Sequence, residues 1–240
     1  DRSVSRGLGD VYKRQPDNFP HPVAAGVFMV YGTSYHALVQ RAKITKDDEV
    51  LVLGASGGVG LAAVDIAKSF GARVVVAVST KEKADVCKRY GVDDVVVYGK
   101  EKLDQEGQKI FTKELKSKST RGGFSIIYDP IGDCFAEPAL RSIGWGGTYL
   151  VVGFAAGKIP SFPTNLMLLK GCAVSGVFIG RFQQEEPKQS AQNIKEIGDL
   201  LSSGKLTPFI SETIPMAKSI DAIERIAKRG VVGKVVFVNN

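Results

Sequence analysis

The sequence predicts a doubly wound α/β fold built on a parallel sheet. Short, nearly uninterrupted apolar runs, of which residues 49–53 are the first, alternate with stretches whose apolar residues recur at helical spacing. Strands buried on both faces have such continuous apolar runs, and strands that alternate with helices indicate right-handed βαβ crossovers. Glycines at Gly71 and Gly91 end the first two expected helices.

The remaining elements follow in order. We expect further strands at 73–78, 95–98, 124–128, 148–152 and 172–178, with helices at 59–70 and 81–90. After Gly180 the pattern changes to a long polar helix at 186–203, a strand near 209–213, a helix at 216–229 and a strand at 234–238. This change predicts a domain boundary near residue 180.

Composition agrees with a globular protein. The 240 residues are 44% hydrophobic and 24% charged, which is not the profile of a disordered chain. No uncharged apolar run approaches the ~18 residues that a membrane-spanning helix needs. Three widely spaced cysteines indicate neither a disulfide framework nor a closed zinc site. We therefore expect a reducing compartment, the cytoplasm, or the mitochondrion if the true N-terminus carries a targeting segment.

The net charge of +7 favours anionic partners without choosing among them. Residues 1–15 show no helical or strand periodicity, and we interpret them as a non-native or disordered leader. A native flexible arm is the alternative. The leader carries four basic and two acidic side chains, which leaves +5 on the rest.

A glycine-rich turn carries the clearest chemical signal. Residues 54–60, Gly-Ala-Ser-Gly-Gly-Val-Gly, lie between a buried strand and an amphipathic helix. In that context small residues let backbone N–H groups approach a pyrophosphate at the helix N-terminus. Ala55 stands where the usual fingerprint has its first glycine, so the match is imperfect. The sequence nevertheless favours a dinucleotide site over a structural turn.

The end of the second strand predicts which dinucleotide binds. Enzymes that use NAD commonly place an acid there, whereas this chain has Ser79-Thr80-Lys81-Glu82-Lys83. Hydroxyl and ammonium groups suit a 2′-phosphate, which favours NADPH over NADH. An ordinary helix N-cap at Ser79 or Thr80 is the alternative, and both roles are compatible.

Other nucleotide-binding classes fit less well. A P-loop needs Lys-Ser or Lys-Thr after its last glycine, but Leu61 and Ala62 follow Gly60. Short-chain dehydrogenases share the glycine spacing, yet the Tyr98/Lys102 pair lies too close to the glycines for their Tyr-x-x-x-Lys motif. A methyltransferase would place an acid at the position of Ser79.

Metal and hydrolytic sites find no support in the sequence. Neither histidine has a second ligand at metal spacing, and we interpret His36 as a packing residue. No Gly-x-Ser-x-Gly elbow occurs, and Asp129, followed by Pro130, is expected to form a turn. A basic cluster at Lys113, Lys116, Lys118 and Arg121 fits a solvated face better than a nucleic-acid surface.

Seven motifs follow one another along the chain: Tyr31-Gly-Thr-Ser-Tyr-His-Ala-Leu38, Val50-Leu-Val-Leu-Gly-Ala-Ser-Gly-Gly-Val-Gly60, Thr80-Lys-Glu-Lys83, Tyr128-Asp-Pro-Ile-Gly132, Gly147-Thr-Tyr-Leu-Val-Val-Gly-Phe154, Gly176-Val-Phe178 and Gly233-Lys-Val-Val236. Together they resemble the medium-chain dehydrogenase/reductase superfamily, most closely its zinc-independent quinone oxidoreductase branch. The resemblance covers residues 16–240.

Matching positions imply a set of cofactor contacts. The pyrophosphate would meet the glycine turn at Gly57, Gly58 and Val59. The 2′-phosphate would be surrounded by Thr80, Lys83 and Tyr98. The nicotinamide side would be approached by Thr33, Gly153, Phe154 and Phe178. For the side chains of Phe154 and Phe178 a role in the core is an equal alternative.

The family also implies a domain arrangement. Residues 16–42 would be a remnant of a GroES-like catalytic domain with connecting helices, residues 43–180 a Rossmann domain, and residues 181–240 the returning segment of the catalytic domain. The chain is then expected to lack the N-terminal part of the catalytic domain, and to be inactive as a fragment unless that part is dispensable. The sequence singles out no residue of this chain as proton donor, and solvent or a group in the missing domain would serve.

The resemblance implies NADPH-dependent hydride transfer to a quinone or another conjugated carbonyl, an enone or enal. An NADPH-binding protein without turnover, serving as a sensor, is one alternative, and an RNA-binding family member is another. The expected strand at Cys172–Phe178 has the character of a sheet edge. Because unprotected edges tend to pair, a homodimer through this strand is expected.

Overall fold

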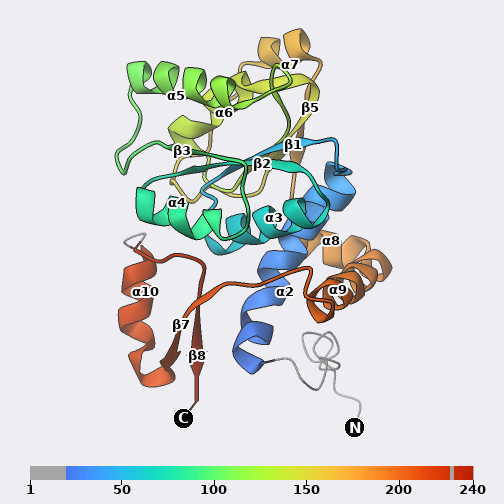
Figure 1. Cartoon of the computed structure of the whole chain (residues 1–240), viewed down its shortest axis with the longest axis vertical. Helices are drawn as coiled ribbons and strands as arrows, with labels where there is room; N and C mark the ends of the chain where they lie inside the picture. The colour runs from blue at the N-terminus through green and yellow to red at the C-terminus, as the bar shows by residue number, and fades with distance from the viewer. Residues whose placement is uncertain (1–19, 228–229, 240) are drawn as a thin grey trace.

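The computed structural model describes residues 20–227 and 230–239, so the expected leader at 1–15 lies outside the described residues. A six-stranded, fully parallel sheet runs through the centre in the order β3-β2-β1-β4-β5-β6 (Figure 1). Its strands are β1 (Glu49–Leu53), β2 (Arg73–Val78), β3 (Asp94–Val97), β4 (Phe124–Asp129), β5 (Ile143–Val151) and β6 (Ala173–Gly176). The predicted doubly wound sheet is confirmed, with its switch point between β1 and β4.

The apolar runs form strands because both faces of the sheet are covered. All five residues of β1 are buried. Val50 and Val52 face one hydrophobic cluster, and Leu51 and Leu53 face the other. Successive side chains of a strand point to opposite faces, so a doubly covered strand is apolar along most of its length, here from Val50 to Leu53.

Helices form a layer on each face (Figure 1). One layer contains α2 (His21–Tyr35), a π-helical turn η1 (His36–Arg41), α3 (Gly58–Ser69) and α4 (Lys81–Lys88). The other contains α5 (Gln105–Lys118), η2 (Asp133–Phe135), α6 (Ala136–Arg141) and α7 (Thr164–Lys170). Gly71, at a φ of 80°, follows the end of α3 and gives the predicted stop. None of the described helices is long and apolar enough to cross a membrane.

The C-terminal segment packs beside α2 and α3. It comprises α8 (Ile179–Glu185), α9 (Pro187–Ser202), β7 (Ile210–Pro215), η3 (Met216–Lys218), α10 (Ser219–Ala227) and β8 (Lys234–Val238). β7 and β8 form a separate two-stranded parallel sheet. The buried carboxylate of Asp65 on α3 fastens this segment, because its Oδ2 accepts hydrogen bonds from the Tyr31 hydroxyl at 2.6 Å and the Thr207 N–H at 2.7 Å.

Several boundaries differ from the sequence prediction. The strand expected at 148–152 begins earlier, at Ile143. Its first half contains glycines that lie against the neighbouring backbone, and a Cβ on Gly147 would lie 3.0 Å from the carbonyl oxygen of Phe124. The edge strand is shorter than 172–178. The helix expected at 216–229 divides into η3 and α10, with residues 228–229 outside the described part.

Candidate functional site

The glycine turn joins β1 to α3 with almost no space between them. Gly54 adopts a φ of 55°, and its carbonyl accepts the N–H of Gly57 at 3.1 Å. A Cβ on Gly60 would lie 2.6 Å from the Gly54 oxygen and 2.7 Å from the Cα of Ala55. No described side chain caps the first turn of α3. Its N–H groups are therefore suited to bind an anion.

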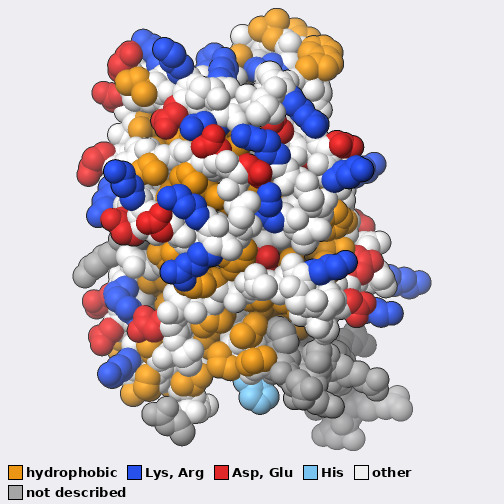
Figure 2. All heavy atoms as spheres, in the orientation of Figure 1, with side chains coloured by type: hydrophobic (Ala, Val, Ile, Leu, Met, Phe, Trp, Pro, Cys, Tyr) orange, Lys and Arg blue, Asp and Glu red, His pale blue; other side chains and the backbone are white. Residues whose placement is uncertain are grey.

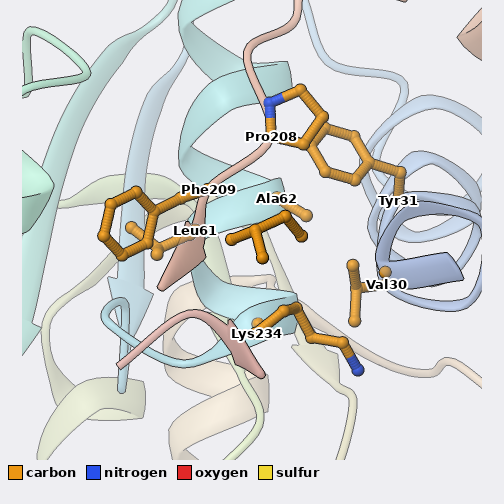
Figure 3. A pocket seen from close by; sticks show the side chains of 10 residues that line it. Val30, Tyr31, Leu61, Ala62, Pro208, Phe209 and Lys234 are labelled. Carbon is orange, nitrogen blue, oxygen red and sulfur yellow. The ribbon is translucent and has the colours of Figure 1, made fainter. Parts of the chain in front are cut away.

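The C-terminal segment reaches this turn, a contact that the sequence analysis missed. The N–H of Gly233 donates to the carbonyl of Ser56 at 2.8 Å, and Gly57 and Gly233 form a parallel bridge. The stem of Lys234 passes over Gly58, where a Cβ would lie 2.8 Å from the lysine Cδ. Figure 3 shows Lys234 in the crevice between α2, α3 and the β7–β8 sheet. The structure thus adds a lysine beside the turn.

A buried chain of hydrogen bonds connects α2 and β4 to the first turn of α3. The Tyr128 hydroxyl lies 2.8 Å from Ser34 Oγ, which donates to the carbonyl of Val59 at 2.9 Å. Thr33 is next to Ser34 but is buried, and its hydroxyl donates to the Met29 carbonyl of its own helix at 2.7 Å. The structure therefore brings the α2 segment to the turn while the Thr33 hydroxyl is occupied locally.

Polar side chains gather at the carboxyl end of β2. Thr80 is the N-cap of α4, and its Oγ1 accepts the N–H of Lys83 at 3.3 Å. The Lys83 ammonium donates to Ser79 Oγ at 3.1 Å. Glu82 is exposed in the same helical turn, and its pKa is lowered by the Thr80 hydroxyl, with a smaller contribution from the charge of Lys100. The predicted cap is confirmed, and both hydroxyls and the ammonium lie together.

Tyr98 lies beside this cluster at the end of β3. Its N–H donates to the carbonyl of Val78 at 3.0 Å, and its ring packs 4.6 Å from that of Phe135, centroid to centroid. The loops after β3 and β4 are joined by an ion pair between Lys102 Nζ and Asp133 Oδ2 at 2.7 Å. This bond lowers the pKa of Asp133.

The two phenylalanines lie at the carboxyl ends of β5 and β6. Phe154 is 40% exposed and follows Gly153, whose N–H donates to the carbonyl of Asp129 at 3.3 Å. Phe178 is 74% exposed and precedes α8. The interpretation of both side chains as core residues is therefore wrong. With them, every predicted site residue except the buried Thr33 lies at the carboxyl edge of the sheet, where doubly wound folds bind their ligands.

Two further predictions concern residues outside this edge. His36 is buried and stacks on Phe182 with ring centroids 3.8 Å apart, which confirms a packing role. In the basic cluster, Lys118 pairs with Asp94 at 3.0 Å, and the face in Figure 2 intersperses basic and acidic side chains. Within the described residues, no three His, Cys, Asp or Glu side chains converge as metal ligands would.

A sequence profile described as zinc-binding dehydrogenase matches residues 58–196, more than half of the chain. The chain belongs to this family. It is thereby a medium-chain dehydrogenase/reductase, as its motifs indicate, and its relatives include quinone oxidoreductases. The quinone oxidoreductase-like protein 2 homolog of Nematostella vectensis is 31% identical over 92% of this chain and 59% of its own length. Human quinone oxidoreductase is 28% identical over 95% of this chain and 65% of its own.

Solved structures of dehydrogenases and reductases with this fold superpose closely on the chain. A mycobacterial protein complexed with NADPH superposes with a TM-score of 0.84 at 25% identity, covering 94% of this chain and 66% of that protein. The quinone oxidoreductase of Thermus thermophilus, also studied with NADPH, gives a TM-score of 0.79 at 25% identity over 93% and 68% of the two chains. This member of the zinc-binding dehydrogenase family spans 59% of the length of the Nematostella relative.

Proposed function

We propose that this chain is the cofactor-binding part of an NADPH-dependent oxidoreductase that transfers hydride to a quinone or another conjugated carbonyl. The cluster of Ser79, Thr80 and Lys83 at the end of β2 carries the proposal. It offers two hydroxyls and an ammonium to a 2′-phosphate, at the position where NAD enzymes place an acid.

The cofactor would bind along the carboxyl edge of the sheet. Its pyrophosphate would meet the turn at Gly57, Gly58 and Val59, where no described side chain caps α3. The N–H of Gly57 already donates to Gly54, so the N–H groups that follow it would bind the phosphate oxygens. The aliphatic part of the Lys234 side chain lies against Gly58 in this turn. Tyr98 would flank the 2′-phosphate.

The nicotinamide end would lie toward the loops after β5 and β6. Gly153 and Phe154 follow β5, Phe178 follows β6, and the α2 segment around Thr33 reaches the turn through Ser34. NADPH supplies the hydride when bound, and the protein's residues orient the ring and exclude water from it.

Relatives support the substrate class. Besides the quinone oxidoreductases, an acryloyl-coenzyme A reductase of Sulfurisphaera tokodaii is 28% identical over 92% of this chain. Acryloyl thioesters and quinones share a carbon–carbon double bond conjugated to a carbonyl, which accepts hydride at its far carbon. This shared chemistry favours an activated alkene or quinone over a simple alcohol or ketone.

A substitution that removes one positive charge tests the cofactor assignment. In Lys83→Gln we expect NADPH to bind roughly tenfold more weakly while NADH binding is unchanged, because the ammonium acts on the 2′-phosphate alone. Lys88→Gln is the matched control, since Lys88 lies on the same helix and pairs with Asp85 at 2.8 Å. Isothermal titration measures both ligands, and an equal loss for NADPH and NADH, or a loss in the control, contradicts the assignment.

The edge strand supports a homodimer. β6 is the last strand of the sheet, and its outer side has no partner strand among the described residues. Pairing of two such edges about a twofold axis would continue the sheet. We expect a dimer by light scattering and a monomer for Ala173→Lys, which places a charge on the exposed edge. A monomeric unaltered chain would refute this pairing.

A further inference from the structure

Asp129 is buried at the end of β4, on the switch-point edge of the sheet. Its Oδ1 accepts the N–H groups of Ile131 at 2.8 Å and Gly132 at 2.9 Å. Its Oδ2 accepts the hydroxyl of Tyr149 at 2.6 Å. One carboxylate therefore accepts hydrogen bonds both from the loop after β4 and from a side chain of β5.

The backbone of Asp129 holds the next loop as well. Its carbonyl oxygen accepts the N–H of Val152 at 2.9 Å and that of Gly153 at 3.3 Å. Asp129 is thus bonded, through side chain or main chain, to both loops that leave the sheet at this point.

The two loops also pack directly on each other. The carbonyl of Ile131 accepts the N–H of Ala156 at 2.8 Å. A Cβ on Gly132 would lie 3.0 Å from Cδ1 of the Phe154 ring, and Gly132 has a φ of 65°. The position of Phe154 therefore depends on the shape of the loop that the Asp129 carboxylate organises.

An acid at this position is costly for stability. Burial raises the pKa of Asp129, although the Tyr149 hydroxyl and the two N–H groups act to lower it. A buried charge destabilises unless every acceptor is paired. Only a carboxylate offers two oxygens that both accept, one to Tyr149 and one to the Ile131 and Gly132 amides. Because both oxygens must accept, the carboxylate fixes the loop after β4 relative to β5.

We propose that Asp129 is a positioning residue that fixes the Gly153–Phe154 turn against the nicotinamide end of the cofactor and acts much less on the phosphate end. The inference rests on the proposed NADPH site. The phosphate end has hydrogen bonds of its own, from Ser34 to Val59 after β1 and at the Thr80 cap beside Lys83. The loop after β4 touches this end only by packing, because the Ile131 side chain lies against Gly54, so a smaller effect is expected there. The hydrogen bonds of the Asp129 carboxylate run instead to Ile131, Gly132 and Tyr149.

The test compares NADPH with 2′-phospho-ADP-ribose, which keeps the phosphates and lacks the nicotinamide. Asp129→Asn keeps the shape but replaces one accepting oxygen with an NH₂ group, so either Tyr149 or the loop amides lose their acceptor. We expect NADPH affinity to fall by roughly fivefold to twentyfold and that of 2′-phospho-ADP-ribose to change by less than about twofold. The fluorescence enhancement of the bound nicotinamide should fall in parallel.

Two phenol variants keep the test decisive if Asp129→Asn folds poorly. Tyr149→Phe removes only the hydroxyl that donates to Asp129, and it should weaken NADPH selectively by about twofold to fivefold. Tyr128→Phe removes the phenol on the opposite face, which bonds Ser34 behind the phosphate turn, and should change both ligands equally.

Equal weakening of both ligands in Asp129→Asn and Tyr149→Phe, or no change in either, would overturn the positioning role and leave the cofactor assignment intact. Failure of the unaltered protein to bind either ligand would instead overturn the proposed NADPH site, and the positioning role with it.

Discussion

Gly60→Ala is the sharpest perturbation of the candidate site. The added Cβ would lie 2.6 Å from the Gly54 oxygen, 2.7 Å from Ala55 Cα and 2.9 Å from Ala55 C. All three are backbone atoms of the turn and cannot rotate away, so α3 must move by about 0.8 Å to reach an ordinary contact near 3.4 Å. Such overpacking costs about 1–3 kcal/mol, against a gain of about 1 kcal/mol from the better helix propensity of alanine.

We therefore expect a net loss of about 2 kcal/mol at most and a melting temperature lower by up to about 8 °C. NADPH affinity should fall by more than about tenfold, because the N–H groups that would hold the pyrophosphate move with α3. Differential scanning calorimetry and titration with NADPH measure the two effects on the same sample.

Gly198→Ala is the matched control. Gly198 lies within α9, and a Cβ there would meet nothing within 4 Å. The same chemical change should stabilise the protein by about 0.5–1 kcal/mol and leave NADPH binding unchanged. If Gly60→Ala behaves like Gly198→Ala in both measurements, the close packing of α3 on β1 and its role in binding are refuted.

Two predictions concern buried carboxylates. Asp65→Ala leaves the Tyr31 hydroxyl and Thr207 N–H without an acceptor and should lower the unfolding free energy by about 2–4 kcal/mol. Asp65→Asn keeps an oxygen for both donors and should lower it by less than about 1 kcal/mol, and equal losses would contradict this role of the carboxylate. Burial acts to raise the pKa of Glu49, but its hydrogen bonds, the one from the Thr120 hydroxyl first, together outweigh burial and lower the pKa. A carboxyl pKa depressed by folding stabilises above the unfolded value and less as the pH falls through the folded value. We therefore expect the unfolding free energy, measured with urea, to fall less between about pH 6 and about pH 3 in Glu49→Gln than in the unaltered protein. An equal fall in both proteins would contradict this account.

The sequence predicts the fold class because burial on both faces imposes a local pattern. Each central strand is apolar along most of its length, as β1 is from Val50 to Leu53, so its position can be predicted without tertiary information. The ends of strands are harder to predict where glycines pack backbone against backbone and no side-chain pattern marks the strand. The first half of β5 contains Gly144, Gly146 and Gly147, and two of these lie against backbone atoms of β4 or the residue before it, which a strand pattern cannot reveal.

In the candidate site, too, local features can be predicted from the sequence and long-range contacts cannot. The glycine turn and the Thr80–Lys83 pair are local in sequence, and local patterns predict them. The approach of Lys234 to Gly58 joins residues far apart in the chain, and nothing in their spacing indicates it. Asp129 was correctly expected to form a turn, but its bond to Tyr149 depends on the pairing of β4 with β5.

The central claim is that the carboxyl edge of this sheet selects NADPH through the 2′-phosphate. Titration calorimetry of the unaltered protein with NADPH and NADH, at one ionic strength, tests it most directly. The account predicts that NADPH binds at least about tenfold more tightly than NADH, because Lys83 and the hydroxyls that lie beside it would make charge-assisted contacts with the 2′-phosphate. Equal affinity for both cofactors, or binding of neither, would contradict it.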